Sequence, residues 1–176
     1  MIIGSALGRL FSGLTVDLTI DGNDITRDVQ YGYGDQKELN KWVLNKGNSQ
    51  KYPLIWYVVT RYTEPSSFKR VRSNLIILQN TQIEWFNTTR SVKSYDAIIE
   101  PTWQKVKKLI EQNPYISVLG DIHVKYRIND QPNFGLKISN ESDFSNKSTS
   151  GDESVTIDTV DGRVINLEFN IKTNCI

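Results

Sequence analysis

Residues 54–59 (LIWYVV) constrain the fold more than any other segment, because every position in the run is apolar. A strand with one wet face alternates apolar and polar residues, whereas an unbroken apolar run is typical of a strand covered on both faces. The segment NLIILQ, residues 74–79, has the same character. We therefore predict a central antiparallel strand pair with other elements packed against it.

The connection between these strands, residues 60–73 (TRYTEPSSFKRVRS), is too long for a tight turn. Connections of this length inside a compact domain usually bind something or project from it. We expect a long projecting hairpin loop that contacts another protein chain. Binding of nucleic acid, with Arg90 and Lys93 assisting, ranks second because the net charge of the chain is only +1. The candidate interface cations are Arg61, Lys69, Arg70 and Arg72.

Residues 94–114 (SYDAIIEPTWQKVKKLIEQNP) show helical periodicity. Pro101 lies inside this pattern, so the helix either begins there or kinks there. We predict an amphipathic helix packed across the sheet. Its inner face comprises Tyr95, Ile98, Ile99, Thr102, Trp103, Val106, Leu109 and Ile110.

The N-terminal part, residues 1–34, is expected to form a helix and hairpin extension. LTVDLTI alternates like a half-buried strand, DGND has turn chemistry, and ITRDVQYGYG is the expected returning strand. A short helix should follow, with Asp35 as its N-cap and Glu38 completing a capping box. The apolar face of the first helix comprises Ile3, Leu7, Leu10, Phe11 and Leu14.

The C-terminal part is predicted to be β-structure. ISVLGDIHVKYRI alternates like a strand, and Asp161 with Gly162 predicts a two-residue hairpin turn between VTIDTV and RVINLEFNI. Residues 129–154 are rich in Ser, Asn and Asp, and we expect a polar excursion that becomes ordered on assembly. The acidic residues near the hairpin are candidate partners for the arginines of the loop: Asp152, Glu153, Asp158 and Asp161.

Together these patterns predict one domain, residues 1–176, of the α/β (α+β) class. Its sheet is mostly antiparallel, with an amphipathic helix packed across it, a long projecting hairpin loop and a C-terminal β-hairpin.

Few residues suggest enzyme chemistry. The chain has one histidine, His123, and one cysteine, Cys175, so we expect neither a histidine-rich zinc site nor a Cys-His pair. Glycine-rich phosphate-binding motifs are absent from the sequence. Carboxylates cluster at Asp17, Asp21, Asp24 and Asp28, so a hydrolase with paired carboxylates stays open as a third hypothesis. We expect no enzymatic activity, no cofactor, no metal and no membrane association.

Several strings resemble the tail-terminator and head-tail completion (neck ring) proteins of tailed bacteriophages. KYPLIWYVV is similar to the start of that family's central strand. The region that begins at NLIILQ and ends at VKKLI is similar to its second strand, linker and helix, and GRVINLEFNIKTNC is similar to its terminal strand. The similarity covers residues 35–176, with departures at LTVDLTIDGNDITRDVQYG and residues 129–154.

The resemblance implies a structural virion protein, assembled in the bacterial host cytoplasm, that forms a homo-oligomeric ring around a DNA channel. Its partners would be further copies of itself and neighbouring portal, connector or tail-tube proteins, with DNA passing through without sequence-specific binding. Whether it is a tail terminator or another neck ring stays open. The alternative is a β-rich binding or adaptor module of a phage fibre or adhesion apparatus.

Overall fold

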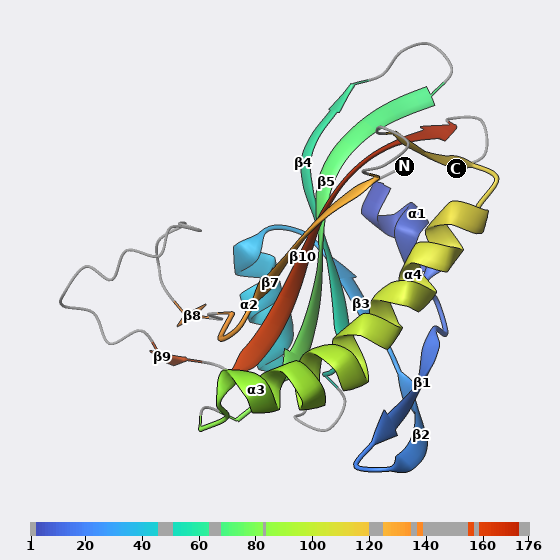
Figure 1. Cartoon of the computed structure of the whole chain (residues 1–176). Helices are drawn as coiled ribbons and strands as arrows, with labels where there is room; N and C mark the ends of the chain where they lie inside the picture. The colour runs from blue at the N-terminus through green and yellow to red at the C-terminus, as the bar shows by residue number, and fades with distance from the viewer. Residues whose placement is uncertain are drawn as a thin grey trace.

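A twisted six-stranded sheet forms the centre of the protein, with helices on both faces (Figure 1). The computed structural model describes residues 3–45, 51–63, 68–82, 84–119, 125–134, 137–138, 155–156 and 159–172. The strands of the sheet are β3 (Gln30–Tyr33), β4 (Leu54–Thr63), β5 (Phe68–Asn80), β6 (Ile116–Leu119), β7 (Tyr126–Gln131) and β10 (Val160–Lys172). Their order is β3-β4-β5-β10-β6, and β7 pairs with β10 along the same edge as β6. Among these pairings only β3 with β4 is parallel, which confirms the α+β class with a mostly antiparallel sheet.

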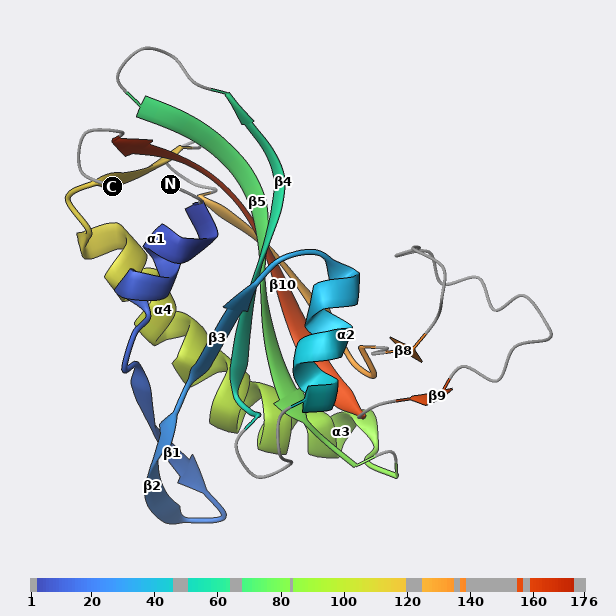
Figure 2. The same cartoon turned by 180° about the vertical axis from the view of Figure 1, so that it is seen from behind.

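The apolar run at the start of β4 is buried on both faces, as its sequence predicts. Ile55 and Tyr57 belong to a large core cluster shared with helices α1 (Ile3–Leu10) and α4 (Glu100–Gln112). Leu54 and Trp56 belong to a smaller cluster under helix α2 (Gln36–Asn45). Figure 2 shows α2 in front of the sheet and α4 behind it. Alternate residues of β4 therefore serve two different cores.

Local sequence signals fix the elements before β4. Asp21 and Gly22, both at positive φ, form the turn between β1 (Thr15–Ile20) and β2 (Asn23–Asp28), as predicted. Asp35 and Glu38 form the expected capping box of α2: each backbone N–H donates to the other residue's carboxylate at 2.9 Å. The predicted returning strand is in fact two, because the chain leaves β1 after Asp28 and joins β4 as β3.

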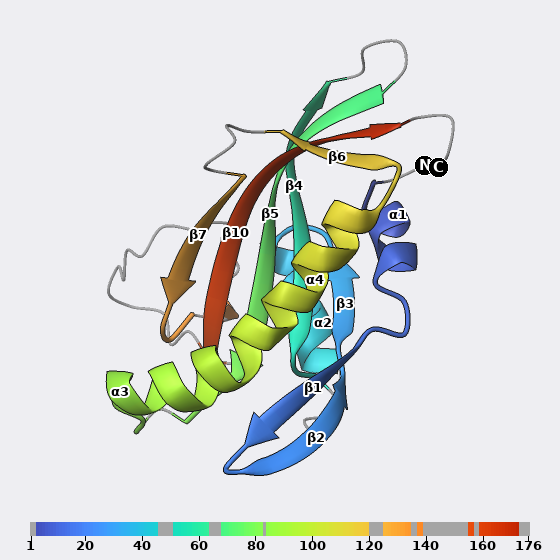
Figure 3. The same cartoon turned by 45° about the vertical axis from the view of Figure 1, so that its right-hand side comes forward.

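A long helical segment crosses the sheet diagonally (Figure 3). It begins as α3 (Asn87–Arg90), widens into the π-helix η2 (Ser91–Ile99) and continues as α4. The predicted inner face is confirmed, with Trp103 and Val106 fully buried. Pro101 lies in the first turn of α4, as one of the two predicted alternatives has it, although the helical segment continues without a break from η2. The Glu100 N–H bonds the carbonyl of Tyr95, five residues back, and this wider turn accommodates a residue that lacks an N–H.

The predicted long loop is wrong, since most of residues 60–73 are strand. β4 continues to Thr63 and β5 begins at Phe68, and β10 pairs with the whole of β5. In β5 the exposed Arg70 and Arg72 alternate with the buried Val71 and Ser73. Because basic residues are so frequent in this segment, its period-two alternation is not evident and the sequence predicts a loop.

The predicted C-terminal hairpin is also wrong. Asp161 and Gly162 lie inside the single long strand β10, opposite Gln79 and Leu78 of β5. A Cβ on Gly162 would meet side-chain atoms of Phe134 and Leu78 at 3.0 to 3.1 Å, so close packing explains this glycine and a turn does not. A separate small pairing joins β8 (Lys137–Ile138) to β9 (Val155–Thr156).

The alternating segment before residue 129 forms two strands, β6 and β7, both paired with β10. Ile122, His123 and Val124 lie outside the described residues. The polar excursion begins later than predicted, because residues 129–131 belong to β7. Most of residues 132–154 lie outside the described ranges, so ordering on assembly stays a prediction.

Candidate interaction surfaces

A buried ion pair joins the start of the long helix to β10. The guanidinium of Arg90, 2% exposed, donates to the carboxylate Oδ1 of Asp161 at 2.6 Å. The same guanidinium donates to the Thr81 hydroxyl and to the carbonyls of Gln82 and Trp85. A buried pair with its donors used this fully is costly to break from one side, because the other charge would stay buried without compensation. Arg90 and Asp161 therefore have a structural role.

A second ionic group clamps α4 to β10 and β7. Arg163 donates to both carboxylate oxygens of Asp130, at 2.6 and 3.0 Å, and to the carboxylate of Glu100. Partial burial works to raise the pKa of Glu100, but hydrogen bonds from Gln104 and Arg163 and nearby positive charges lower it overall. Burial raises the pKa of Tyr95, whose hydroxyl donates to the Gly162 carbonyl at 3.4 Å.

This ionic group contains the residue types of an acid-base site, yet both carboxylates are held by the same guanidinium. A general base needs a carboxylate able to reach a substrate proton. In the described part of the chain, no group of three or more His, Cys, Asp or Glu is arranged to hold a metal ion.

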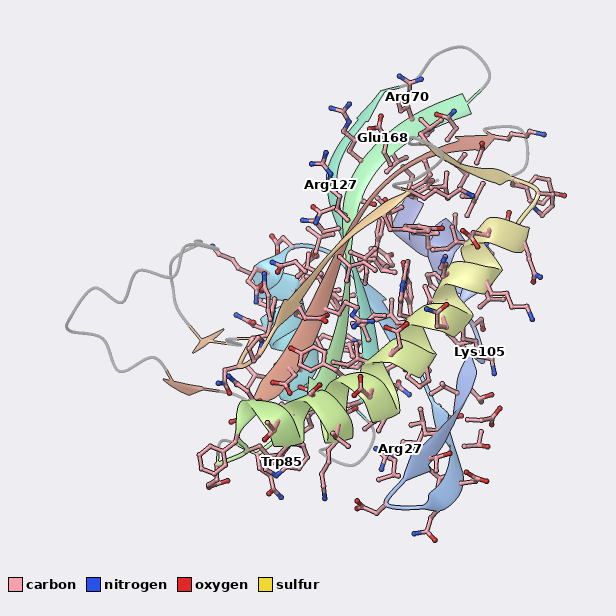
Figure 4. The ribbon with its side chains drawn as sticks, in the orientation of Figure 1. Arg27, Arg70, Trp85, Lys105, Arg127 and Glu168 are labelled. Atoms are coloured by element: carbon pink, nitrogen blue, oxygen red, sulfur yellow. The ribbon has the colours of Figure 1, made fainter. Side chains whose placement is uncertain are left out.

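An exposed polar surface, the basic sheet face, covers the end of the sheet that α2 leaves open. It is defined by side chains of the same parity on three neighbouring strands: Arg70, Arg72 and Asn74 of β5, Asn166, Glu168, Asn170 and Lys172 of β10, and Arg127 of β7. Arg72 Nε lies 2.9 Å from Glu168 Oε2. Figure 4 shows Arg70, Glu168 and Arg127 on the same side of the sheet. The opposite parity, including Val71 and Phe169, is buried under α1 and α4.

The structure places the predicted interface cations in different environments. Arg70 and Arg72 lie on the basic sheet face. Lys69 is half-buried and has the parity of Val71, and Arg61 lies in β4 opposite Arg72, where its backbone alone is described.

Of the predicted acidic partners, the structure describes Asp161 alone. Asp161 as an interface residue is wrong, because it is fully buried against Arg90. Asp152, Glu153 and Asp158 lie outside the described residues. Sequence reasoning missed Arg127, since no local signal indicates that β7 aligns it with Asn166 of β10.

A second polar surface, the acidic ribbon face, lies on the β1–β2 hairpin. Cross-strand pairing places Thr and Asp opposite each other three times: Thr15 with Asp28, Asp17 with Thr26, and Thr19 with Asp24. The hydroxyls of Thr26 and Thr19 each donate to the facing carboxylate at 2.7 Å. The other side of the ribbon buries Val16 and Leu18 against the long helix. The ribbon is thus held by apolar contacts and presents three carboxylates outward.

No helix within the described residues has the length and apolar character needed to cross a membrane. Comparison with protein-family models and with curated proteins found no match to this chain.

Proposed function

We propose that the chain is a structural subunit of a tailed-bacteriophage virion, a tail terminator or head-tail connector that forms a homomeric ring around the DNA channel. The observation that carries this proposal is an arm, made of residues 58–63 of β4 and 68–74 of β5, that projects beyond the body of the molecule (Figure 1). One face of the arm is packed, with Val71 in the large core cluster, while its opposite face and its β4 edge are placed to contact another chain.

The edge of the arm supports the proposal. Among the described strands, β3 pairs with β4 only as far as Tyr57, so residues 58–63 have no partner strand on their outer side. Proteins usually shorten or cover exposed strand edges, because free backbone N–H and C=O groups attract other strands. A long projecting edge is therefore suited to an ordered contact with a neighbouring subunit.

The order of elements supports it as well. The family resemblance implies an early helix, a central strand entering a long hairpin, a helix after the hairpin and a closing C-terminal β-hairpin. In this chain α1, the β4–β5 pair and α4 occur in that order, and the single strand β10 stands in place of the closing hairpin. The proposed partners are further copies of the chain and the neighbouring portal, connector or tail-tube proteins. DNA would pass through the opening, and no turnover is involved.

The test is the mass of the purified chain by analytical ultracentrifugation, together with electron microscopy of the particles. We expect a discrete ring of about six to twelve copies with a central opening. A monomer at all concentrations and in the presence of neck or tail proteins would overturn the proposal. A monomer or trimer that binds a carbohydrate or receptor would support the fibre-adaptor alternative.

A further inference from the structure

The basic sheet face and the acidic ribbon face carry opposite charges. On the first, four cations (Arg70, Arg72, Arg127 and Lys172) and one carboxylate (Glu168) give a formal charge of +3. On the second, three carboxylates (Asp17, Asp24 and Asp28) and no cation give −3. Arg27, the cation of the ribbon, has the parity of Val16 and lies on its other side.

The arm and the ribbon lie at opposite ends of the molecule (Figures 1 and 3). The acidic ribbon face therefore cannot reach the basic end of its own sheet. Any pairing between these two surfaces must join different copies of the chain.

We propose that the acidic ribbon face of one copy docks on the basic sheet face of the next copy. This inference rests on the proposed ring function and names the surfaces that link its subunits. Both surfaces are segments of β-structure without an apolar side chain among their defining residues, so electrostatic complementarity selects the partner and the register.

The chemistry of the two surfaces is matched in detail. Arginine can hold a carboxylate through two parallel hydrogen bonds. Arg70 and Arg127 are both exposed on the basic sheet face. Asp17 and Asp24 each accept a hydrogen bond from a facing threonine through Oδ1. That bond orients the carboxylate and leaves lone pairs on it for a guanidinium.

The contact is head-to-tail, since one patch meets a different patch on the next copy. Contacts of this type generate a closed ring when the rotation between copies closes, and a filament when it does not. A two-fold dimer that set each surface against its own copy would oppose like charges, whereas pairing of ribbon with sheet face satisfies both surfaces. This pairing is therefore compatible with ring assembly.

The test uses full-length variants that each reverse two charges. The ribbon variant is Asp17→Lys with Asp24→Lys, and the sheet variant is Arg70→Glu with Arg127→Glu. The matched control is Lys105→Glu with Lys108→Glu on α4, neither of which is among the defining residues of the two surfaces. Circular dichroism confirms folding, and mass photometry at about 0.15 M salt, where charges interact over roughly 8 Å, measures the ring fraction.

We expect each swapped variant to lose the ring at least about tenfold, while the control assembles like the wild type. An equimolar mixture of the ribbon and sheet variants should recover association in alternating order, and closed rings where the copy number is even, because each contact between unlike variants again joins opposite charges. Recovery also answers the objection that a swapped variant is misfolded.

Normal rings from either swapped variant, or no recovery in the mixture, would overturn the inference while leaving the ring proposal intact. A wild-type chain that forms no ring would overturn the proposed function itself. If the sheet variant assembles normally but loses retention on a DNA column, the basic sheet face binds DNA and the docking proposal is wrong.

Discussion

The central strands behave differently in their two halves. In the covered half, which contains residues 54–57 of β4 and 75–78 of β5, helices lie on both faces and every side chain is buried. In the open half, which contains residues 68–74 of β5 and 166–172 of β10, only α1 and α4 pack on one face, and the other carries the basic sheet face. Strand β5 is therefore a continuous apolar run where α2 covers the sheet, and it alternates exposed and buried residues where α2 does not. The open half is the part of the sheet that remains available for contact.

The largest expected effect comes from the helix that covers both halves. Trp103 is buried and its ring packs edge-on against Tyr126, with ring centroids 5.0 Å apart. Trp103→Ala should lower the free energy of unfolding by about 3 to 5 kcal/mol, because it leaves a cavity. Urea denaturation measures this. Arg70→Ala in the open half is the control and should change stability by less than about 0.5 kcal/mol. Near-equal losses of unfolding free energy for the two variants would contradict the assignment of Trp103 to the core and of Arg70 to the contact surface.

The buried ion pair between Arg90 and Asp161 provides a second test of core stability. Arg90→Ala should cost about 3 to 5 kcal/mol, because Asp161 would remain buried without its cation. The double variant Arg90→Met with Asp161→Leu removes both charges and should be more stable than the single variant. Chemical denaturation of the three proteins gives the comparison. A double variant less stable than the single one would argue that Asp161 does not depend on Arg90.

Within β10, a smaller effect separates the two halves. Gly162→Ala should destabilise by about 1 to 3 kcal/mol, since a methyl group would crowd Phe134 and Leu78. Asn166→Ala, at an exposed position further along the same strand, should be close to neutral. Thermal melts compare the two. Tolerance of alanine at Gly162 would show that Phe134 and Leu78 do not crowd this position.

The smallest expected effect is a pH dependence at the clamp around Arg163. The pKa of Glu100 is lowered in the folded protein, so its contribution is present above the pKa of the unfolded chain and is lost as pH falls through the folded value. Wild-type protein should therefore lose more stability on acidification than Glu100→Gln does. Melting temperatures between neutral and strongly acidic pH measure the difference, and parallel curves would contradict the ion pair with Arg163.

Patterns carried by neighbouring residues were predictable. The burial of residues 54–57 on both faces, the capping box of Asp35 and Glu38, and the inner face of α4 each follow from a short local period or a fixed spacing. The turn chemistry of Asp-Gly succeeded at residues 21–22 and failed at residues 161–162. At the second site the glycine meets packing from Phe134 and Leu78, which are distant in sequence.

The sequence by itself determined the class of the fold, the long helix and the basic character of β5, because period, caps and composition act over a few residues. Tertiary structure alone decided which charges are surface and which are core: Asp161 is buried, and Arg70 joins Arg127 from a strand more than fifty residues away on one open face. The physical reason is that strand register decides on which face of the sheet a side chain lies, and the extent of α2 decides whether that face is covered. Both depend on long-range pairing that no local pattern specifies.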